Sequence, residues 1–186
     1  MKKIVYYVNQ FYGQIGGEEA ADQTPIVKEG SVGPAVAMQE ALKDIGEVVA
    51  TIVCGDNYFA DHQDEALEEI LKVVEEKTPD LFIAGPGFNA GRYGLACGTI
   101  CDAVAAKYKI PVLTGLYPEN PGAEMFHKTV YIVETPISAA GMRKVIPVEK
   151  KVINTVLKDP ISFQFEGVGT WLGYKVGIKL QQVMGE

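Results

Sequence analysis

The fold is decided by the stretch Leu81-Phe82-Ile83-Ala84-Gly85-Pro86-Gly87-Phe88-Asn89-Ala90-Gly91-Arg92. Its first four residues form a continuous apolar run, which predicts a buried strand. A glycine-rich loop follows, and residues 93–108 then have the pattern of a helix. Strand, loop and helix in this order form the repeating unit of a parallel α/β sheet.

The same unit recurs on both sides of this stretch. Buried strands are expected at residues 4–8, 48–53, 81–84, 111–114 and 130–133, and helices at residues 34–45, 61–77, 93–108 and 138–158. Continuous apolar strands between helices predict a three-layer α/β domain around a mainly parallel five-stranded sheet. We expect the flavodoxin-like strand order 2-1-3-4-5.

A single domain is expected over residues 1–186, with its core in residues 1–158. Residues 159–186 are rich in aromatic residues and glycine. We predict an apolar C-terminal helix docked on the sheet in this segment, with a surface for a partner as the alternative.

Composition excludes several classes of protein. The 186 residues carry a net charge of -7, from 24 acidic and 17 basic side chains, and no basic face for nucleic acid is visible. No apolar run approaches the ~20 residues that cross a membrane, and the start lacks the pattern of a signal peptide. Three cysteines are too few for a secreted disulfide framework. We therefore expect a cytoplasmic protein without a membrane or nucleic-acid partner.

The three cysteines differ in their predicted roles. Cys97 and Cys101 lie four residues apart on one helix and are expected to be small core residues, and no metal site is predicted. Cys54 ends a strand and opens a polar loop. It is a candidate catalytic nucleophile if a positive group lowers its pKa, and an inert thiol otherwise.

Ligands of open α/β sheets bind outside the carboxyl ends of the strands, where the strand order reverses. For the expected order this crevice lies between the first and third strands, beside loops 9–32 and 85–92. Glu18 and Glu19 follow two glycines and are candidates for acid–base work or for holding an ammonium group; a solvated turn is the alternative.

Asn89 and Arg92 are candidates for binding a carboxylate. The alternative for Arg92 is an ion pair with a surface carboxylate. Residues 16–19 do not form a phosphate-binding Walker loop, because no Gly-Lys-Ser/Thr follows them. Residues 85–90 miss the dinucleotide fingerprint Gly-x-Gly-x-x-Gly, since Ala90 stands in the last place, and Pro86 weakens the match further. The remaining substrate-binding candidates are Asp56, Asn57, Tyr58, Tyr93, Glu119 and Asn120.

Seven segments of the chain resemble one known family, the selenoprotein B subunits of the glycine, sarcosine and betaine reductase complexes. The resemblance covers about residues 1–150, the amino-terminal part of that subunit. The segments are Val8-Asn9-Gln10-Phe11, Gly16-Gly17-Glu18-Glu19, Val27-Lys28-Glu29-Gly30, Cys54-Gly55-Asp56-Asn57-Tyr58-Phe59, Ala84-Gly85-Pro86-Gly87-Phe88-Asn89-Ala90-Gly91-Arg92-Tyr93-Gly94, Tyr117-Pro118-Glu119-Asn120-Pro121-Gly122 and Ser138-Ala139-Ala140-Gly141-Met142-Arg143.

The resemblance implies reductive cleavage of the α-carbon–nitrogen bond of a small zwitterionic or carboxylate substrate. In the family a selenocysteine attacks the α-carbon, the carboxymethyl group passes to a partner selenoprotein, and a second subunit carries a pyruvoyl group in the glycine-specific case. This chain departs from the pattern, because it has no selenocysteine and no cysteine after Cys101, and the family subunit is more than twice as long.

We therefore expect a subunit or stand-alone paralogue that binds the substrate while partner chains or missing regions supply selenocysteine and pyruvoyl groups. Other reductase-complex subunits and a homo-oligomer are the expected partners. Two alternatives stay open. One is a non-catalytic binding or assembly module of the same fold, and the other is a small enzyme that uses Cys54.

Overall fold

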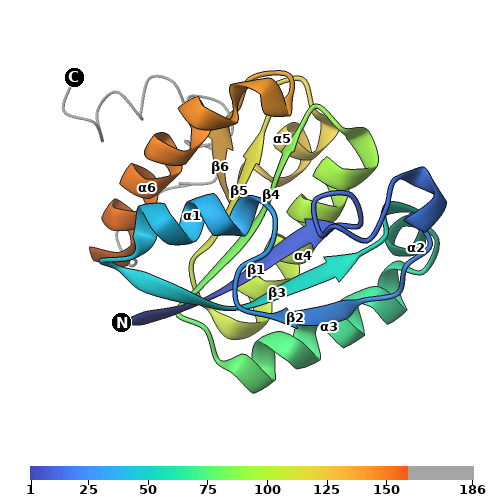
Figure 1. Ribbon diagram of the computed structural model, residues 1–186, viewed down its shortest axis with the longest axis horizontal. Helices are drawn as coiled ribbons and strands as arrows, with labels where there is room; N and C mark the ends of the chain where they lie inside the picture. Colours follow the sequence, from blue (N-terminus) through green and yellow to red (C-terminus); the bar gives the residue numbers. More distant parts are fainter. Residues whose placement is uncertain (159–186) are drawn as a thin grey trace.

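The computed structural model describes residues 1–158. In this range a sheet is covered by helices on both faces, with α1 and α6 on one face and α3 and α4 on the other (Figure 1). The strands are β1 (Lys2–Asn9), β2 (Ile26–Glu29), β3 (Gly46–Cys54), β4 (Leu81–Phe88), β5 (Val112–Leu116) and β6 (Tyr131–Glu134). The helices are α1 (Pro34–Leu42), α2 (Asp56–Asp61), α3 (Gln63–Lys77), α4 (Gly91–Tyr108), α5 (Pro121–Phe126) and α6 (Met142–Lys158), with short 3-10 turns η1 (Glu18–Ala20) and η2 (Ala139–Gly141).

The sheet has six strands in the order β2-β3-β1-β4-β5-β6. The five strands expected from the sequence are present, parallel to one another and in the expected relative order. The prediction of five strands is nevertheless wrong, because β2 adds an antiparallel edge beside β3. The four residues of β2 alternate between half-buried and exposed, so they lack the continuous apolar run that marks a buried strand.

Several boundaries also differ from the expectation. β4 continues to Phe88 instead of ending at Ala84, and every residue of it is buried. The short helices α2 and α5 lie in segments that were expected to be loops. Each spans six residues, too few for a helical period to stand out in the sequence. The predicted apolar C-terminal helix lies outside the described residues.

The core has two layers because successive residues of β1 point to opposite faces of the sheet. Val5 and Tyr7 pack with α3 and α4, whereas Ile4, Tyr6 and Val8 pack with α1 and α6. Cys97 and Cys101 are fully buried in the first layer, as predicted. Between residues 1 and 158, no helix combines the length and the apolar character needed to cross a membrane.

Glycine lets two helices approach closely at the carboxyl end of β5. A Cβ atom on Gly98 of α4 would lie 2.2 Å from Cδ2 of Phe126, the last residue of α5. We predict that Gly98→Ala lowers the free energy of unfolding by roughly 1–3 kcal/mol, because an extra methyl group overpacks this contact. Chemical denaturation measures the change.

The matched control is Gly91→Ala in the same helix, where a Cβ atom would meet nothing within 4 Å. This variant should retain the stability of the parent chain. An equal loss in both variants would contradict the role given to the contact between Gly98 and Phe126.

Candidate functional site

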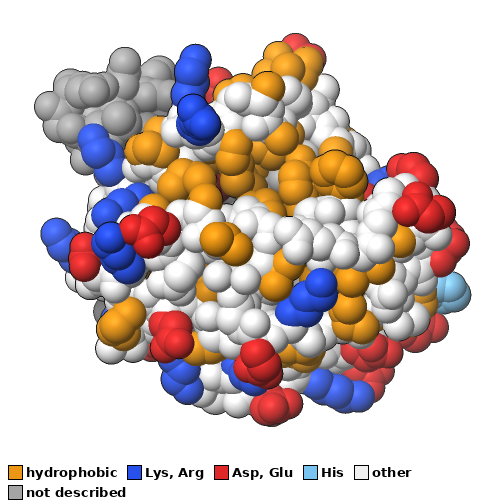
Figure 2. All heavy atoms as spheres, in the orientation of Figure 1, with side chains coloured by type: hydrophobic (Ala, Val, Ile, Leu, Met, Phe, Trp, Pro, Cys, Tyr) orange, Lys and Arg blue, Asp and Glu red, His pale blue; other side chains and the backbone are white. Residues whose placement is uncertain are grey.

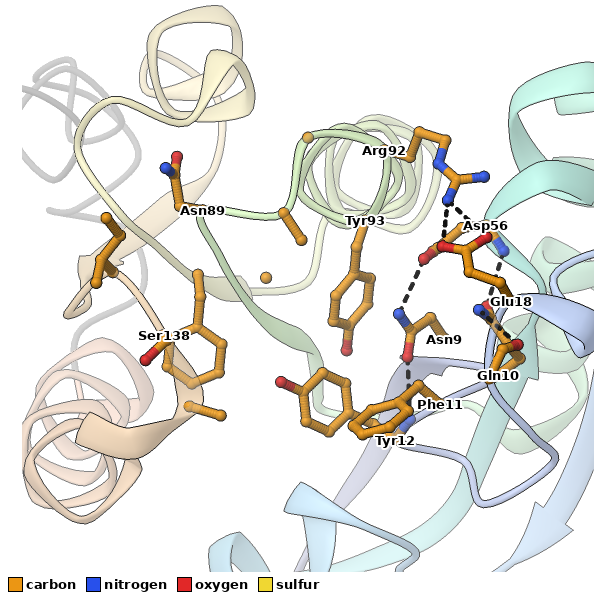
Figure 3. A pocket seen from close by; sticks show the side chains of 17 residues that line it. Asn9, Gln10, Phe11, Tyr12, Glu18, Asp56, Asn89, Arg92, Tyr93 and Ser138 are labelled. Carbon is orange, nitrogen blue, oxygen red and sulfur yellow. Dashed lines mark hydrogen bonds and ion pairs between the residues drawn. The ribbon is translucent and has the colours of Figure 1, made fainter.

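A pocket of about 430 Å³ opens at the carboxyl ends of β1 and β4. The chain passes from β1 to β3 on one side and later to β4 on the other, so the pocket lies at the predicted reversal of strand order. Figure 3 shows its walls, which come from segments far apart in the sequence. They are Asn9, Gln10, Phe11, Tyr12, Gly17, Glu18, Asp56, Gly87, Phe88, Asn89, Ala90, Gly91, Arg92, Tyr93, Ile137, Ser138 and Ala139.

Asp56, the first residue of α2, forms the acidic wall of the pocket. The amide of Asn9 donates a hydrogen bond to its Oδ2 at 2.9 Å, and the backbone N–H of Asp56 donates to Oε1 of Gln10 at 3.0 Å. Its second oxygen, Oδ1, is buried and has no hydrogen-bond partner among residues 1–158. Burial raises the pKa of Asp56, and the hydrogen bond from Asn9 and the charge of Arg92 oppose this shift. The carboxylate can therefore accept a further hydrogen bond from a cationic ligand.

Arg92, in the first turn of α4, is paired in this structure. Its Nη2 donates to both carboxylate oxygens of Glu18, at 2.8 and 3.1 Å, and its Nη1 donates to the side chain of Asn57. The alternative of an ion pair with a surface carboxylate is thus what the structure contains. Exposed ion pairs stabilise proteins by about 0–1 kcal/mol, so another carboxylate can replace Glu18 at little energetic cost.

Three aromatic side chains form a second wall. The rings of Tyr12 and Tyr93 stack at 5.7 Å, and the rings of Phe11 and Tyr12 meet edge to face at 5.2 Å. Tyr93 is buried, and its hydroxyl has no hydrogen-bond partner within the described chain. Aromatic faces beside a carboxylate attract a cation, particularly where water is excluded.

The side of the pocket opposite Asp56 is mainly apolar and is exposed. Ile137, Ser138 and Ala139 follow β6, and Figure 3 shows Ser138 across the pocket from Asp56 and Gln10. Phe11 and Ile137 are 62% and 60% exposed. Figure 2 shows hydrophobic side chains gathered across this face of the molecule.

Glu18, Asp56, Asn89, Arg92 and Tyr93 are the predicted site residues that the structure brings to the pocket. Asn89 and Arg92, expected to hold one carboxylate together, lie on opposite sides of Tyr93 in Figure 3. Sequence reasoning did not select Asn9, Gln10, Phe11 or Tyr12. Their position in the sequence is the one signal, because these polar and aromatic residues end the central strand β1 or follow it directly.

The other predicted residues lie outside the pocket lining. Burial raises the pKa of Cys54 to about 12, which keeps its thiol protonated at neutral pH. The carboxylate of Glu19 accepts the N–H of Gly17 at 2.7 Å, and the ring of Tyr58 lies 4.8 Å from that of His62.

Asn120 has a structural role near the pocket, whereas Glu119 is exposed beside it in the chain. The Asn120 amide donates to the carbonyl oxygens of Phe88 at 2.9 Å and Ala90 at 3.1 Å. Asn120 therefore holds the loop that carries the pocket-lining residues 87–93.

Comparison with known proteins gives one consistent family. Residues 1–166 match the family model for glycine/sarcosine/betaine reductase selenoprotein B. The chain is 56% identical over 145 residues to the glycine reductase complex component B subunit gamma of Carboxydothermus hydrogenoformans, which covers 78% of this chain and 33% of the relative.

Two further relatives come from Peptoclostridium acidaminophilum. The sarcosine reductase complex component B subunit beta is 48% identical, over 81% of this chain and 35% of its own length. The betaine reductase complex component B subunit beta is 45% identical, over 84% of this chain and 36% of its own length. The chain thus spans about a third of these relatives. No solved structure gives a significant match.

The hydrogen bond between Asn9 and Asp56 can be tested through the pKa of Asp56. Because this bond lowers the pKa of Asp56 against the effect of burial, Asn9→Ala should raise the pKa of Asp56 further. The carboxyl group should then lose its charge at a higher pH than in the parent chain. A ¹³C NMR titration of the aspartate side chains measures the change.

Asn89→Ala serves as the control, because Asn89 lines the same pocket but is exposed. Its removal should leave the pKa of Asp56 where it was. An unchanged Asp56 pKa in the Asn9 variant would show that the bond does not stabilise the charged carboxylate.

Proposed function

The chain belongs to the glycine/sarcosine/betaine reductase selenoprotein B family, and from this premise we propose that it binds a small amino-acid-derived substrate for reductive carbon–nitrogen cleavage. The proposal assigns binding to this chain and the redox centre to another chain or region. The single observation that carries it is Asp56, whose unpartnered carboxylate oxygen lines a pocket with an aromatic second wall.

A substrate nitrogen that carries a positive charge suits this corner of the pocket. The Asp56 carboxylate offers the opposite charge, and the faces of Tyr12 and Tyr93 offer cation–π attraction. Because the carboxylate is buried, water screens its attraction for a cation less than at the surface. The arrangement favours an ammonium or methylated ammonium group.

Arg92 is the proposed partner for the substrate carboxylate. The guanidinium already holds one carboxylate, that of Glu18, through two hydrogen bonds. In the proposed complex the substrate carboxylate takes the place of Glu18, which moves into solvent, where 77% of its side chain is already exposed. A zwitterion would then meet a negative group and a positive group in one pocket.

The redox centre belongs, in this proposal, to a selenocysteine- or pyruvoyl-bearing chain or region. Among residues 1–158 all three cysteines are buried, and none lines the pocket. The relatives named above are subunits of reductase complexes, which supports other subunits of such a complex as partners. A cytoplasmic location and a homo-oligomeric state complete the proposal.

Isothermal titration calorimetry with glycine, sarcosine and betaine tests the proposed binding. At least one of them should bind, and Asp56→Asn should weaken that binding about 10- to 100-fold, because a charged hydrogen bond contributes about 1.5–3 kcal/mol. Propionate, which lacks the nitrogen, should bind equally weakly to both chains.

Glu119→Gln is the matched control, since Glu119 is exposed and does not line the pocket. Its affinity should equal that of the parent chain. Absence of binding to all three compounds, or equal affinity of the Asp56→Asn variant, would reject the proposed function.

A further inference from the structure

Two oxygen atoms of the pocket lining are buried without a hydrogen-bond partner among residues 1–158. They are Oδ1 of Asp56 and the hydroxyl oxygen of Tyr93. Native proteins keep few such groups, so each calls for an explanation. The ionised carboxylate of Asp56 only accepts hydrogen bonds, and it is the stronger acceptor of the two because it carries a charge.

The side chains beside Asp56 already use their donors elsewhere. The backbone N–H of Tyr12 donates to Oδ1 of Asn9 at 3.0 Å, which turns the Asn9 amide so that Nδ2 donates to Oδ2 of Asp56 at 2.9 Å. The Gln10 amide accepts the backbone N–H of Asp56 at 3.0 Å and donates to the carbonyl oxygen of Gly17 at 3.4 Å. This arrangement fixes one oxygen of the Asp56 carboxylate and leaves the other for a ligand.

Arg92, the cationic residue of the pocket lining, is also engaged with other groups. Its Nη1 donates to the side chain of Asn57, which directly follows Asp56, and its Nη2 donates to Glu18. In Figure 3 the carboxylates of Glu18 and Asp56 lie on the Arg92 side of the pocket. In the proposed complex Glu18 leaves this position, and its departure gives a ligand access to Oδ1 of Asp56.

A buried charged acceptor distinguishes substrate nitrogens by their hydrogens. An ammonium nitrogen with at least one N–H can donate a charge-assisted hydrogen bond to Oδ1 of Asp56. A quaternary nitrogen has the same positive charge but no hydrogen to donate, so it leaves the carboxylate oxygen without water and without a partner. A site that hydrogen-bonds an N–H group therefore rejects the analogue that lacks it.

The aromatic wall does not compensate a quaternary nitrogen for this loss. Aromatic faces attract ammonium groups of every kind, and quaternary groups are typically bound in cages of several rings. Tyr93 is 1% exposed, and its ring stacks on that of Tyr12 with an angle of 28° between the planes, so the two rings cover each other. Phe11 meets Tyr12 edge to face and is exposed. The three rings thus form a wall and do not enclose a cation.

We propose that Asp56 makes the site selective for substrates whose nitrogen carries at least one hydrogen, so that glycine and sarcosine bind much more tightly than betaine. The inference rests on the proposed function and narrows its substrate class. Asp56 is the residue that determines specificity. Asn9 is a positioning residue, because its hydrogen bond decides which carboxylate oxygen is free.

Four ligands that differ only in the methyl groups on nitrogen test the inference in the parent chain. Glycine, sarcosine and N,N-dimethylglycine each retain an N–H at neutral pH, whereas betaine has none. Calorimetry should show the largest loss of affinity between N,N-dimethylglycine and betaine. The expected loss is about 5- to 140-fold, which corresponds to about 1–3 kcal/mol for an unpaired buried acceptor.

Two variants assign this loss to one oxygen. Asp56→Ala removes the proposed acceptor and should bind N,N-dimethylglycine and betaine with equal, lower affinity. Tyr93→Phe removes only the other unpaired oxygen and should retain the difference between the two ligands. Circular dichroism checks that both variants fold, and the ligand series in the parent chain decides the inference if Asp56→Ala does not.

The outcomes separate this inference from the proposed function. Equal affinity for N,N-dimethylglycine and betaine, or an even decline with each methyl group, overturns the selectivity and leaves the proposed function standing. A difference that persists in Asp56→Ala or disappears in Tyr93→Phe contradicts the role of Asp56. If none of the four compounds binds, the proposed function fails, and this inference fails with it.

Discussion

β1 lies between β3 and β4 and is parallel to both, so its backbone pairs on two sides, and the side chains of residues 4–9 are buried. This double pairing places the reversal of strand order at the end of β1. The polar residues Asn9, which ends β1, and Gln10, which follows it, are held at that point by the strand. The hydrogen bonds of Asn9 and Gln10 to Asp56 then join the end of β1 to the beginning of α2.

Two carboxyl groups of the protein, those of Asp56 and Glu149, are buried, although burial disfavours a charged carboxylate. Asp56 is buried, and within residues 1–158 its carboxylate accepts one hydrogen bond, from Asn9. Glu149 is buried completely and has no partner in residues 1–158. Keeping such groups reduces stability, because burial disfavours their charged forms. The two carboxyl groups differ, since Asp56 lines a pocket where a cation can neutralise it, whereas Glu149 is enclosed near Gly115 and burial raises its pKa to about 8.

The exposed apolar side of the pocket can be compared with the length of the chain relative to its family. The relatives are about three times as long as the matching segment. Phe11 and Ile137 both line the pocket, and both are exposed. An open pocket binds a small ligand less tightly than an enclosed one, because less of the ligand surface is removed from water. The geometry thus suits a site whose walls are completed by other parts of a larger assembly.

The sequence by itself determined the α/β class, the five parallel strands and their relative order, because continuous apolar runs between helices admit few other arrangements. It also determined the family, through long motifs such as residues 84–94. Only the tertiary structure decided that β2 pairs with β3, that Arg92 pairs with Glu18, and that Cys54 is buried away from the pocket. The buried position of Glu149 depends on Gly115, which is 34 residues away in the chain, so no local pattern could reveal it. Periodicity reports which face of an element is buried, whereas contacts between distant residues depend on how the elements pack.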